Sequence, residues 1–404
     1  MISIVAPAYK RSATRNGVNP TRDAIINVDL ASMDNLDHTA TLIAWLAFGL
    51  AVVFGAVANR VNFCTMGALT DVIHIGDWRR MRMWLLAMAV AIAGVALLDA
   101  ARLVDFSKTI YTGPRVPWLS SIVGGFLFGF GMTLASGCGS KSLIRLGAGN
   151  LKSLVVLIVL AISAYMTLKG LFAVWRVSAL DPVRFDTAAI GASHSDLASL
   201  VAARFGGSAL TRTGVPLMVA AALAAFALGS RDFRASPAMI FGGVVIGAVI
   251  VAGWYVSGHL GYVAEDPRTL EEMFIATNSG RAESFSFVAP NAYLLELLML
   301  WSDRSRIVTF GVAGVLGMLV GSAAVALATR TFRWEGFAST EDLVNHIAGG
   351  VLMGFGGVTA LGCTIGQGLS GISTLALGSV LALLAIVAGC ATALKYQYLK
   401  VEAA

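Results

Sequence analysis

Charged residues are scarce in this sequence. Asp, Glu, Lys and Arg make up only 13% of the 404 residues, which is about half of the share in an average globular chain. Such a chain has too few polar side chains to cover its own surface. The shortage excludes an ordinary soluble domain, a disordered protein and a nucleic-acid module, and it predicts that the surplus apolar surface faces lipid.

Cysteine is also sparse. The four cysteines form no Cys-x-x-Cys pair, and no His-x-x-His or Cys-Pro-Cys motif accompanies them. This pattern excludes a secreted disulfide scaffold and disfavours soft-metal ligation. The sequence has no nucleotide-binding motif either, so we expect neither a metal nor an organic cofactor.

What the sequence does contain is long apolar runs. Hydrophobic residues make up 57% of the chain, and the mean hydropathy is +0.78. Since an apolar helix of about 20 residues spans a bilayer, the runs predict an all-α polytopic membrane protein with about nine transmembrane helices and short broken half-helices. The expected spans are 40–57, 83–100, 118–135, 151–175, 214–229, 237–256, 306–328, 342–360 and 374–396.

Polar stretches separate these runs. Residues 1–39 are polar, mixed in charge and without an apolar signal-peptide core, so we expect a flexible N-terminal tail there. Residues 40–400 then form a single transmembrane domain. Two long intervals, 176–213 and 257–305, are expected to form caps or short interfacial helices, because irregular backbone cannot face lipid.

Basic residues in the short loops predict an orientation. The chain has a net charge of +6, and basic loops of membrane proteins lie on the cytoplasmic side. The basic loops here follow alternate spans, so they share one face with the C-terminus, while the tail and both long intervals lie outside. The loop residues are Arg79, Arg80, Arg82, Lys141, Arg145, Lys152, Arg231, Arg234, Arg330 and Arg333.

An internal repeat is the strongest signal in the sequence. Residues 124–138 match residues 349–363 at nine of fifteen positions, including a Gly-Cys pair in the same register. The copies lie in the third and eighth expected spans. Because successive spans cross the membrane in alternate directions and the copies are an odd number of spans apart, the second copy runs in the opposite direction to the first. Inverted repeats with interrupted helices are typical of secondary transporters, whose substrate site lies where the halves meet. We place the halves at about 40–210 and 214–400.

Three of the four cysteines share one local pattern. Cys64, Cys138 and Cys363 each end an apolar helix and precede glycine and hydroxyl residues. Backbone N–H groups freed at such a break favour an anion, and a thiol placed there is a weak, polarizable donor suited to sulfur. The alternative is that all four cysteines are small buried residues. We adopt that alternative only for Cys390, which lies inside an apolar run.

The residues around these cysteines resemble the YeeE/YedE family. The resemblance rests on R-V-N-F-C-T-M-G-A-L at 60–69, on G-F-G-M-T-L-A-S-G-C-G at 129–139, on G-F-G-G-V-T-A-L-G-C-T-I-G-Q-G-L-S-G at 354–371, and on S-F-S-F-V-A-P at 284–290. It extends over about residues 40–396. That family consists of bacterial inner-membrane proteins for the uptake of thiosulfate or related sulfur compounds.

The resemblance implies a structure and a mechanism. It implies an hourglass-shaped helical protein in which half-helices meet at the centre, and in which Cys64, Cys138 and Cys363 pass the anion inward through S–H···S hydrogen bonds. The chain departs from the family in its long outside intervals and in having no Cys-Pro-x-Pro sulfur-carrier domain at its end. These departures leave open which sulfur compound is the substrate and which molecule accepts it, and a cytoplasmic sulfur-carrier protein is one expected partner.

Several polar residues near the cysteines have two interpretations. Lys141 and Arg145 lie one helical turn apart, and they either attract a dianion that leaves toward the cytoplasm or serve only as topogenic charges. Thr364 and Gln367 either offer hydrogen bonds beside Cys363 or cap a helix. Glu296 interrupts an apolar run too short to span, so we expect an interfacial helix rather than an intramembrane functional acid.

Tryptophan near segment ends is typical of interfacial anchors. We expect this role for Trp45, Trp84, Trp118, Trp175 and Trp254.

Together these features predict a multi-pass transporter, not an enzyme, in the bacterial inner membrane with its C-terminus in the cytoplasm. The expected substrate is thiosulfate or a related small soft sulfur anion. Transport of sulfite, sulfide or a selenium compound is one alternative. A membrane thiol–disulfide electron-transfer protein is another, although it needs a low-pKa thiol and a resolving neighbour.

Overall fold

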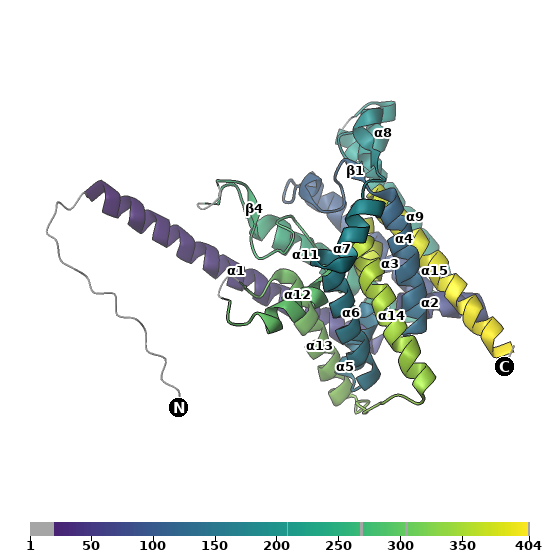
Figure 1. Ribbon diagram of the computed structural model, residues 1–404. Coiled ribbons are helices and arrows are strands. Elements are labelled where there is room, and N and C mark those ends of the chain that lie inside the picture. Colours follow the sequence, from purple (N-terminus) through teal and green to yellow (C-terminus); the bar gives the residue numbers. More distant parts are fainter. Residues whose placement is uncertain (1–19, 208, 267–269, 304–305, 403–404) are drawn as a thin grey trace, which may run out of the picture.

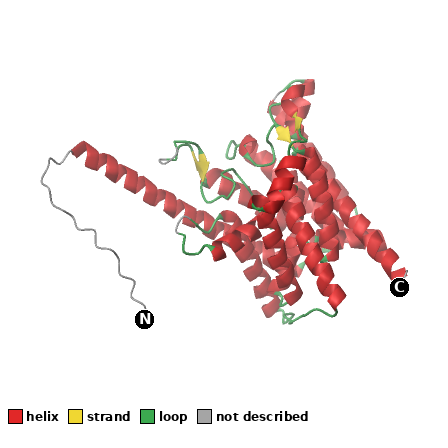
Figure 2. Ribbon diagram, in the orientation of Figure 1, coloured by secondary structure: helices red, strands yellow, loops and turns green. Residues whose placement is uncertain are grey.

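Helices dominate the structure (Figure 1, Figure 2). The computed structural model describes residues 20–207, 209–266, 270–303 and 306–402. Within these ranges, the only strands form two antiparallel pairs, β1 (Arg115–Val116) with β2 (Phe185–Asp186) and β3 (Tyr262–Val263) with β4 (Met273–Phe274). The prediction of an all-α membrane protein is confirmed.

Eight helices in the described part of the chain are long and apolar enough to cross a membrane. They lie on eight of the nine expected spans. The remaining expected span, 342–360, is also a long helix, α14 (Thr340–Thr359), but polar residues in its first turns lower its hydropathy. The eight are α1 (Pro20–Arg60), α3 (Arg79–Ala100), α4 (Trp118–Leu134), α6 (Leu151–Lys169), α9 (Ala209–Leu228), α11 (Pro237–Tyr255), α13 (Phe310–Ala328) and α15 (Leu377–Glu402).

Short helices follow three of the long ones, as the glycine-cysteine breaks predict. After α1 come α2 (Thr65–Thr70) and the π-helix η1 (Asp71–Ile75), and after α4 comes α5 (Gly139–Gly147). After α14 comes the helical stretch 364–373, which contains the π-helix η6 (Gly366–Gly371). Each short helix begins directly after one of Cys64, Cys138 and Cys363.

The remaining short elements lie mostly in the two long intervals, where caps and short helices were expected. They are η2 (Phe106–Lys108), α7 (Leu171–Trp175), η3 (Arg176–Leu180), η4 (Thr187–Ile190), α8 (Leu197–Phe205), α10 (Arg231–Arg234), η5 (Val256–Leu260) and α12 (Ala289–Met299).

The N-terminal boundary differs from the expectation. α1 begins at Pro20, so residues 20–39 of the stretch expected to be a tail are helical. Proline suits the first position of a helix because its φ is already helical and its missing N–H would have no partner there. Residues 1–19 lie outside the described residues.

The basic loops gather on one face of the bundle, which we call the basic face. The Arg333 backbone N–H donates to the Ala148 carbonyl at 3.0 Å, Lys152 pairs with Asp342 at 2.6 Å, and Lys400 pairs with Glu341. In Figure 1 the ends of α5, α13 and α14 lie at the bottom with the C-terminus.

The long intervals meet on the opposite face, which we call the loop face. Lys108 pairs with Glu272, β1 pairs with β2, and the Leu377 N–H donates to the Ser195 carbonyl at 2.9 Å. Figure 1 shows α8, β1 and β4 at this upper end. The predicted division of loops between two faces is therefore present in the structure.

The two copies of the sequence repeat, α4 and α14, cross directly against each other. A Cβ added at Gly124 would lie 2.5 Å from the Ala360 nitrogen, and one added at Gly349 would lie 2.8 Å from the Ala135 nitrogen. These two contacts are equivalent in the repeat, because Gly124 corresponds to Gly349 and Ala360 corresponds to Ala135. The helices are thus antiparallel copies related by an approximate two-fold axis, and glycine lets their backbones touch.

Other helix pairs follow the same symmetry. α1 packs on α13 as α11 packs on α3, and α15 packs on α4 as α6 packs on α14. α9 lies outside this arrangement and packs mainly on α3. The crossing of α4 and α14 lies at the centre, and the breaks after both helices place Cys138 and Cys363 beside it.

Candidate functional site

Each of the three junction cysteines follows a helix end of the same type. Two residues before each cysteine the backbone is left-handed, with φ of 54° at Asn62, 56° at Ser136 and 59° at Leu361. The next N–H donates to the carbonyl five residues earlier, which is the Schellman ending of a helix. These bonds join Phe63 to Ala58, Gly137 to Met132 and Gly362 to Gly357, at 2.9, 2.8 and 2.7 Å.

Each long helix ends shortly before its cysteine, and the cysteine is the residue that directly precedes the next short helix. Cys64 and Cys363 each accept a hydrogen bond at Sγ from the backbone N–H three residues on, of Gly67 and Gly366, both at 3.4 Å. Cys138 differs, because its Sγ contacts the Ser140 hydroxyl at 3.2 Å. The sulfurs of Cys64 and Cys363 are therefore held by an N–H group of the helix that follows, while the sulfur of Cys138 contacts a hydroxyl group of the next helix.

The half-helices after Cys138 and Cys363 run to opposite faces. α5 leads from Cys138 to Asn150, whose backbone pairs with Glu335 on the basic face. The stretch 364–373 leads from Cys363 to Ala376, whose backbone pairs with Asp196 on the loop face. The two thiols thus lie in the middle of the bundle, where both half-helices begin.

The segment 284–288 passes between these two thiols. The Phe287 N–H donates a hydrogen bond to Cys363, while the Phe287 carbonyl oxygen lies 3.1 Å from the position of a Cβ on Gly139, the residue after Cys138. Phe285 and Phe287 are fully buried and pack edge-on against Phe54, with ring centroids 6.3 and 5.9 Å apart. The backbone of one residue, Phe287, therefore touches both cysteine junctions, and aromatic rings surround it.

The three thiols form a connected set. Cys138 lies within electrostatic range of both Cys64 and Cys363, and all three are buried and free. Cys390 is also buried and free and lies within electrostatic range of Cys64 and Cys138, but it lies within α15 rather than at a break, and its Sγ accepts a hydrogen bond from the Thr133 hydroxyl at 3.3 Å. The structure brings Cys64, Cys138 and Cys363 together, and their position at helix breaks distinguishes them from Cys390.

Buried hydroxyl groups without partners accompany two of these cysteines. Thr65 and Thr364, the residues after Cys64 and Cys363, are buried, and their Oγ1 atoms have no hydrogen-bond partner among the described residues. A buried hydroxyl without a partner costs about 1–3 kcal/mol, so these groups are arranged for something other than stability. Gln367 combines both expected roles, because its Nε2 donates to the Ala360 carbonyl at the end of α14 while its Oε1 has no such partner.

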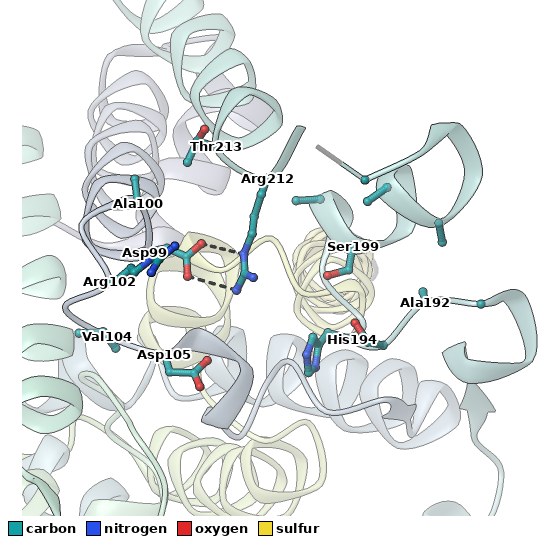
Figure 3. Close-up of a pocket in the computed structure, with 16 residues that line it drawn as sticks. Asp99, Ala100, Arg102, Val104, Asp105, Ala192, His194, Ser199, Arg212 and Thr213 are labelled. Carbon is teal, nitrogen blue, oxygen red and sulfur yellow. Dashed lines mark hydrogen bonds and ion pairs between the residues drawn. The ribbon is translucent and has the colours of Figure 1, made fainter. Parts of the chain in front are cut away.

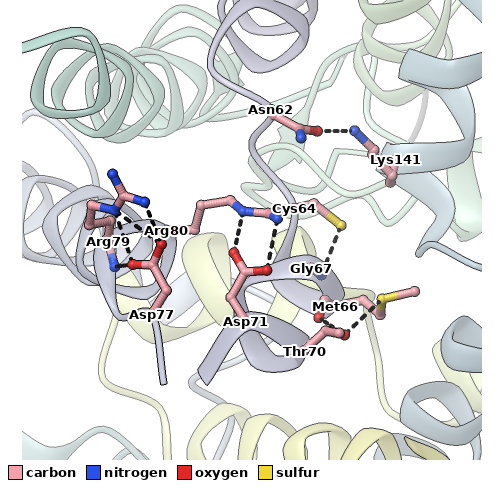
Figure 4. A network of polar contacts seen from close by, with 10 residues as sticks. All are labelled: Asn62, Cys64, Met66, Gly67, Thr70, Asp71, Asp77, Arg79, Arg80 and Lys141. Atoms are coloured by element: carbon pink, nitrogen blue, oxygen red, sulfur yellow. Dashed lines mark hydrogen bonds and ion pairs between the residues drawn. The ribbon is translucent and has the colours of Figure 1, made fainter. Parts of the chain in front are cut away.

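The end of the cysteine set toward the basic face carries cations (Figure 4). Lys141 donates to the Asn62 side chain at 2.5 Å and lies within electrostatic range of Cys64 and Cys138. Arg145 donates to the Ser136 carbonyl at 3.1 Å. Both predicted cations therefore hold the helix ends that precede Cys64 and Cys138.

A third cation at this end was predicted only as a topogenic charge. Arg80 pairs with Asp71 at 2.5 Å and lies within electrostatic range of Cys64. Its guanidinium covers Gly67, where an added Cβ would be 2.4 Å from Nη1. Arg80 comes from α3 and Asp71 from η1, so no local spacing in the sequence indicates their contact with the cysteine.

A wide cavity on the loop face lies apart from this site (Figure 3). It has a volume of about 1070 Å³, and none of the four cysteines lines it. Arg212 reaches across to Asp99, with contacts of 3.0 and 3.4 Å. Its cation is thus already paired with a carboxylate.

Glu296 and two tryptophans differ from their expected roles. Glu296 is only 5% exposed and pairs with Lys169 at 2.9 Å and Arg306 at 3.2 Å, so it joins α12 to α6 within the protein instead of facing the interface. Trp254 is fully buried and donates to the Ser373 hydroxyl at 3.0 Å, and Trp84 is buried over Gly368. The anchor prediction is wrong for both, because core space at helix ends also takes large rings. Trp45, Trp118 and Trp175 are exposed.

Comparison with known proteins agrees with the resemblance noted in the sequence. The family described as Sulphur transport matches residues 60–392. The chain belongs to this family. The Thiosulfate transporter TsuA of Escherichia coli is 26% identical over 320 residues, which cover 78% of the present chain and 84% of that protein.

Two further relatives extend the comparison. The Thiosulfate transporter TsuA of Spirochaeta thermophila is 24% identical over 354 residues, covering 85% of this chain and 96% of the relative. The Probable transporter YedE of Escherichia coli is 30% identical over 105 residues, covering 26% of this chain and 24% of the relative. The chain is accordingly a multi-pass membrane transporter of this family and not an enzyme.

Proposed function

We propose that this protein imports thiosulfate, or a closely related soft sulfur anion, by passing it from Cys363 to Cys138 to Cys64. The observation that carries the proposal is the arrangement of three buried thiols directly after three helix endings of the same Schellman type, two of them related by the internal repeat. The family and the names of its relatives support a sulfur anion as the substrate.

The chemistry of each station suits a soft dianion. Each cysteine directly precedes a short helix, and the N–H groups at the start of a helix favour negative charge. The thiol itself donates a weak hydrogen bond to the terminal sulfur of the anion, and the unpaired hydroxyls of Thr364 and Thr65 supply donors for its oxygens. Conduction needs stations that bind well enough to admit an ion and weakly enough to release it, and three such contacts in sequence meet this need.

Charges favour an anion at the Cys64 end of the cysteine set. Lys141 and Arg145 lie there on the basic face, which we infer to be cytoplasmic, whereas the Arg80 cation is already paired with Asp71. We infer that the protein lies in the bacterial inner membrane with its C-terminus inside, and that the anion leaves past Cys64 toward a cytoplasmic sulfur-carrier protein. Lys141 and Arg145 stabilise an anion near this exit by Coulomb attraction.

Uptake of labelled thiosulfate by cells that lack their own thiosulfate uptake tests this function. We expect cells that express the protein to accumulate label, and unlabelled thiosulfate to compete more strongly than sulfite or selenite. Accumulation of labelled sulfite or selenite without any accumulation of thiosulfate would assign a different substrate. Growth on thiosulfate as the sole sulfur source provides a second readout.

A further inference from the structure

A small cavity lies between the loop face and Cys363. It has a volume of about 190 Å³, which corresponds to several water molecules at about 30 Å³ each and so has room for a small oxyanion. Leu361 and Gly362, directly before Cys363, form part of its wall, and Ser279, Ser286 and Ser284 contribute hydroxyl-bearing residues to it. We call it the outer cavity, because it opens beside the cysteine nearest to the loop face.

One acidic residue, Glu283, lines the outer cavity. It lies between the spans α11 and α13 and is half-buried. The Ser279 hydroxyl donates to its Oε2 at 3.1 Å, and the Asn278 backbone N–H donates to the carboxylate as well. The carboxyl is therefore held in place by neutral donors.

No cation in the described part of the chain lines this cavity or pairs with Glu283. The other titratable residues of the wall are Tyr111 and Tyr293, and Tyr111 lies within electrostatic range of both Glu283 and Cys363. The nearby cations are engaged elsewhere: Lys169 and Arg306 pair with Glu296, Lys108 pairs with Glu272, and Arg281 donates to the Thr109 carbonyl.

The protonation of such a carboxyl changes near neutral pH. Burial raises the pKa of Glu283 to about 7, against the lowering effect of its hydrogen bonds from Ser279 and Asn278. Below that pH the group is a neutral acid that donates a hydrogen bond, and above it the group is an anion. An ionised carboxylate in a small cavity repels a dianion, whereas a carboxylic acid provides it with a donor.

We propose that the outer cavity is the entry site for the anion and that Glu283 is its proton-bearing residue, which admits the anion only as the neutral acid. The proposal rests on the proposed function, because it assumes that the anion travels to Cys363. One proton binds to the Glu283 carboxylate from the outer solution before the anion enters, and no other bond forms or breaks. Anion entry is thereby linked to external protons without a separate proton relay.

The test is thiosulfate uptake into cells at several external pH values around 7, with internal pH held constant. We expect wild-type uptake to be high below about pH 7 and to fall as pH rises through the pKa of Glu283. Glu283→Gln, which imitates the neutral acid, should keep the high rate across the whole range. Glu272→Gln is the matched control, since Glu272 is an exposed acid on the same face, and it should keep the wild-type profile.

A second variant tests the role of Glu283 even if Glu283→Gln fails to fold. Ser279→Ala removes a donor that favours the ionised form, so the fall in uptake should move to higher pH. A pH profile of Glu283→Gln that still falls like the wild type, or an unmoved midpoint in Ser279→Ala, would overturn the role of Glu283. Absence of thiosulfate uptake by every variant and by the wild type at every pH would instead refute the proposed function.

Discussion

At the scale of single residues, buried hydroxyls without partners stand beside two of the cysteines. Thr65 and Thr364 occupy the same position relative to their cysteines, and both bury a hydroxyl that has no partner in the described structure. The buried hydroxyls of Thr359 and Ser379 also have no partner there, whereas that of Thr133 donates to a backbone carbonyl. What distinguishes Thr65 and Thr364 is their position directly after a cysteine, and under the relay that we propose they serve as donors to the anion.

Replacement of Thr364 by valine tests whether its hydroxyl serves the stability of the protein or the transport of the anion. Thr364→Val keeps the shape and removes a hydroxyl without a partner, so thermal stability in detergent should stay the same or rise, because such a group costs about 1–3 kcal/mol when buried. Thiosulfate uptake should fall, since the anion loses a donor beside Cys363. Thr133→Val is the control, and it should lower stability by about 1 kcal/mol because its hydroxyl is bonded. A stability loss in Thr364→Val with normal uptake would show that this hydroxyl is structural.

At the scale of helices, two kinds of contact hold the half-helices in place. The first is the glycine crossing of α4 and α14, where backbone meets backbone. The second is the ion-pair group of Glu296, which ties α12 to α6 next to the segment that carries Phe287. The glycine crossing adjoins the Cys138 and Cys363 junctions, so a change in it should move the thiols apart, while a change in the Glu296 group should loosen α12 from α6.

An alanine at the crossing tests the first contact. The new Cβ of Gly349→Ala would lie 2.6 Å from the Gly131 carbonyl oxygen, and the helices must separate to accept it. Overpacking of this kind costs about 1–3 kcal/mol, so we expect a lower melting temperature and reduced uptake. Gly49→Ala is the matched control in a helix, because nothing lies within 4 Å of its Cβ position. Equal effects of the two substitutions would refute the role of the crossing.

Neutralisation of the buried acid tests the second contact. Glu296→Gln removes a buried carboxylate whose hydrogen bonds to Lys169 and Arg306 are charge-assisted, and such bonds contribute about 1.5–3 kcal/mol. The Lys169 and Arg306 side chains are 46% and 39% exposed, so water solvates their charges afterwards and the loss should lie at the low end of that range. Glu272→Gln breaks an exposed pair with Lys108 and should change stability by less than about 1 kcal/mol. The measurement is the denaturation midpoint of each variant in detergent. Nearly equal midpoints for the two variants would mean that the Glu296 group contributes little to the stability of the protein.

At the scale of the whole molecule, the two faces differ in charge and in structure. The basic face carries short loops tied by ion pairs, while the loop face carries both long intervals and the outer cavity. The approximate two-fold axis between α4 and α14 directs one half-helix to each face: the half-helix after Cys138 leads to the basic face and the one after Cys363 leads to the loop face. Under the relay that we propose, the loop face is the entrance for the anion and the basic face is its exit.

Labelling of single introduced cysteines tests this orientation. The native cysteines are all buried, so their background reaction with a membrane-impermeant maleimide should be low. Glu272→Cys on the loop face should react in intact cells, and Glu341→Cys on the basic face should react only after the membrane is permeabilised. The reverse pattern would invert the protein in the membrane and contradict an exit past Cys64.

The sequence predicts the repeating parts of this structure and misses the contacts between distant segments. The breaks at Cys64, Cys138 and Cys363 and the close packing of α4 on α14 follow from glycine and cysteine patterns, because these act through local backbone geometry. The family resemblance includes residues 284–290, but the contacts of the Phe287 backbone with both cysteine junctions are not predictable from it, since they depend on how distant segments pack. Arg80, Asp71 and Glu283 were also missed, because each gains its role from a neighbour on another element.

The central claim is that three thiols at helix breaks carry the anion, and transport by cysteine variants tests it most directly. Purified wild type, Cys138→Ala and Cys390→Ala are compared in proteoliposomes by the initial rate of labelled thiosulfate uptake. A hydrogen bond to a charged group contributes about 1.5–3 kcal/mol, so Cys138→Ala should lose about tenfold or more of the rate. Cys390→Ala should transport like the wild type. Equal rates for Cys138→Ala and wild type, at equal protein levels, would contradict the relay.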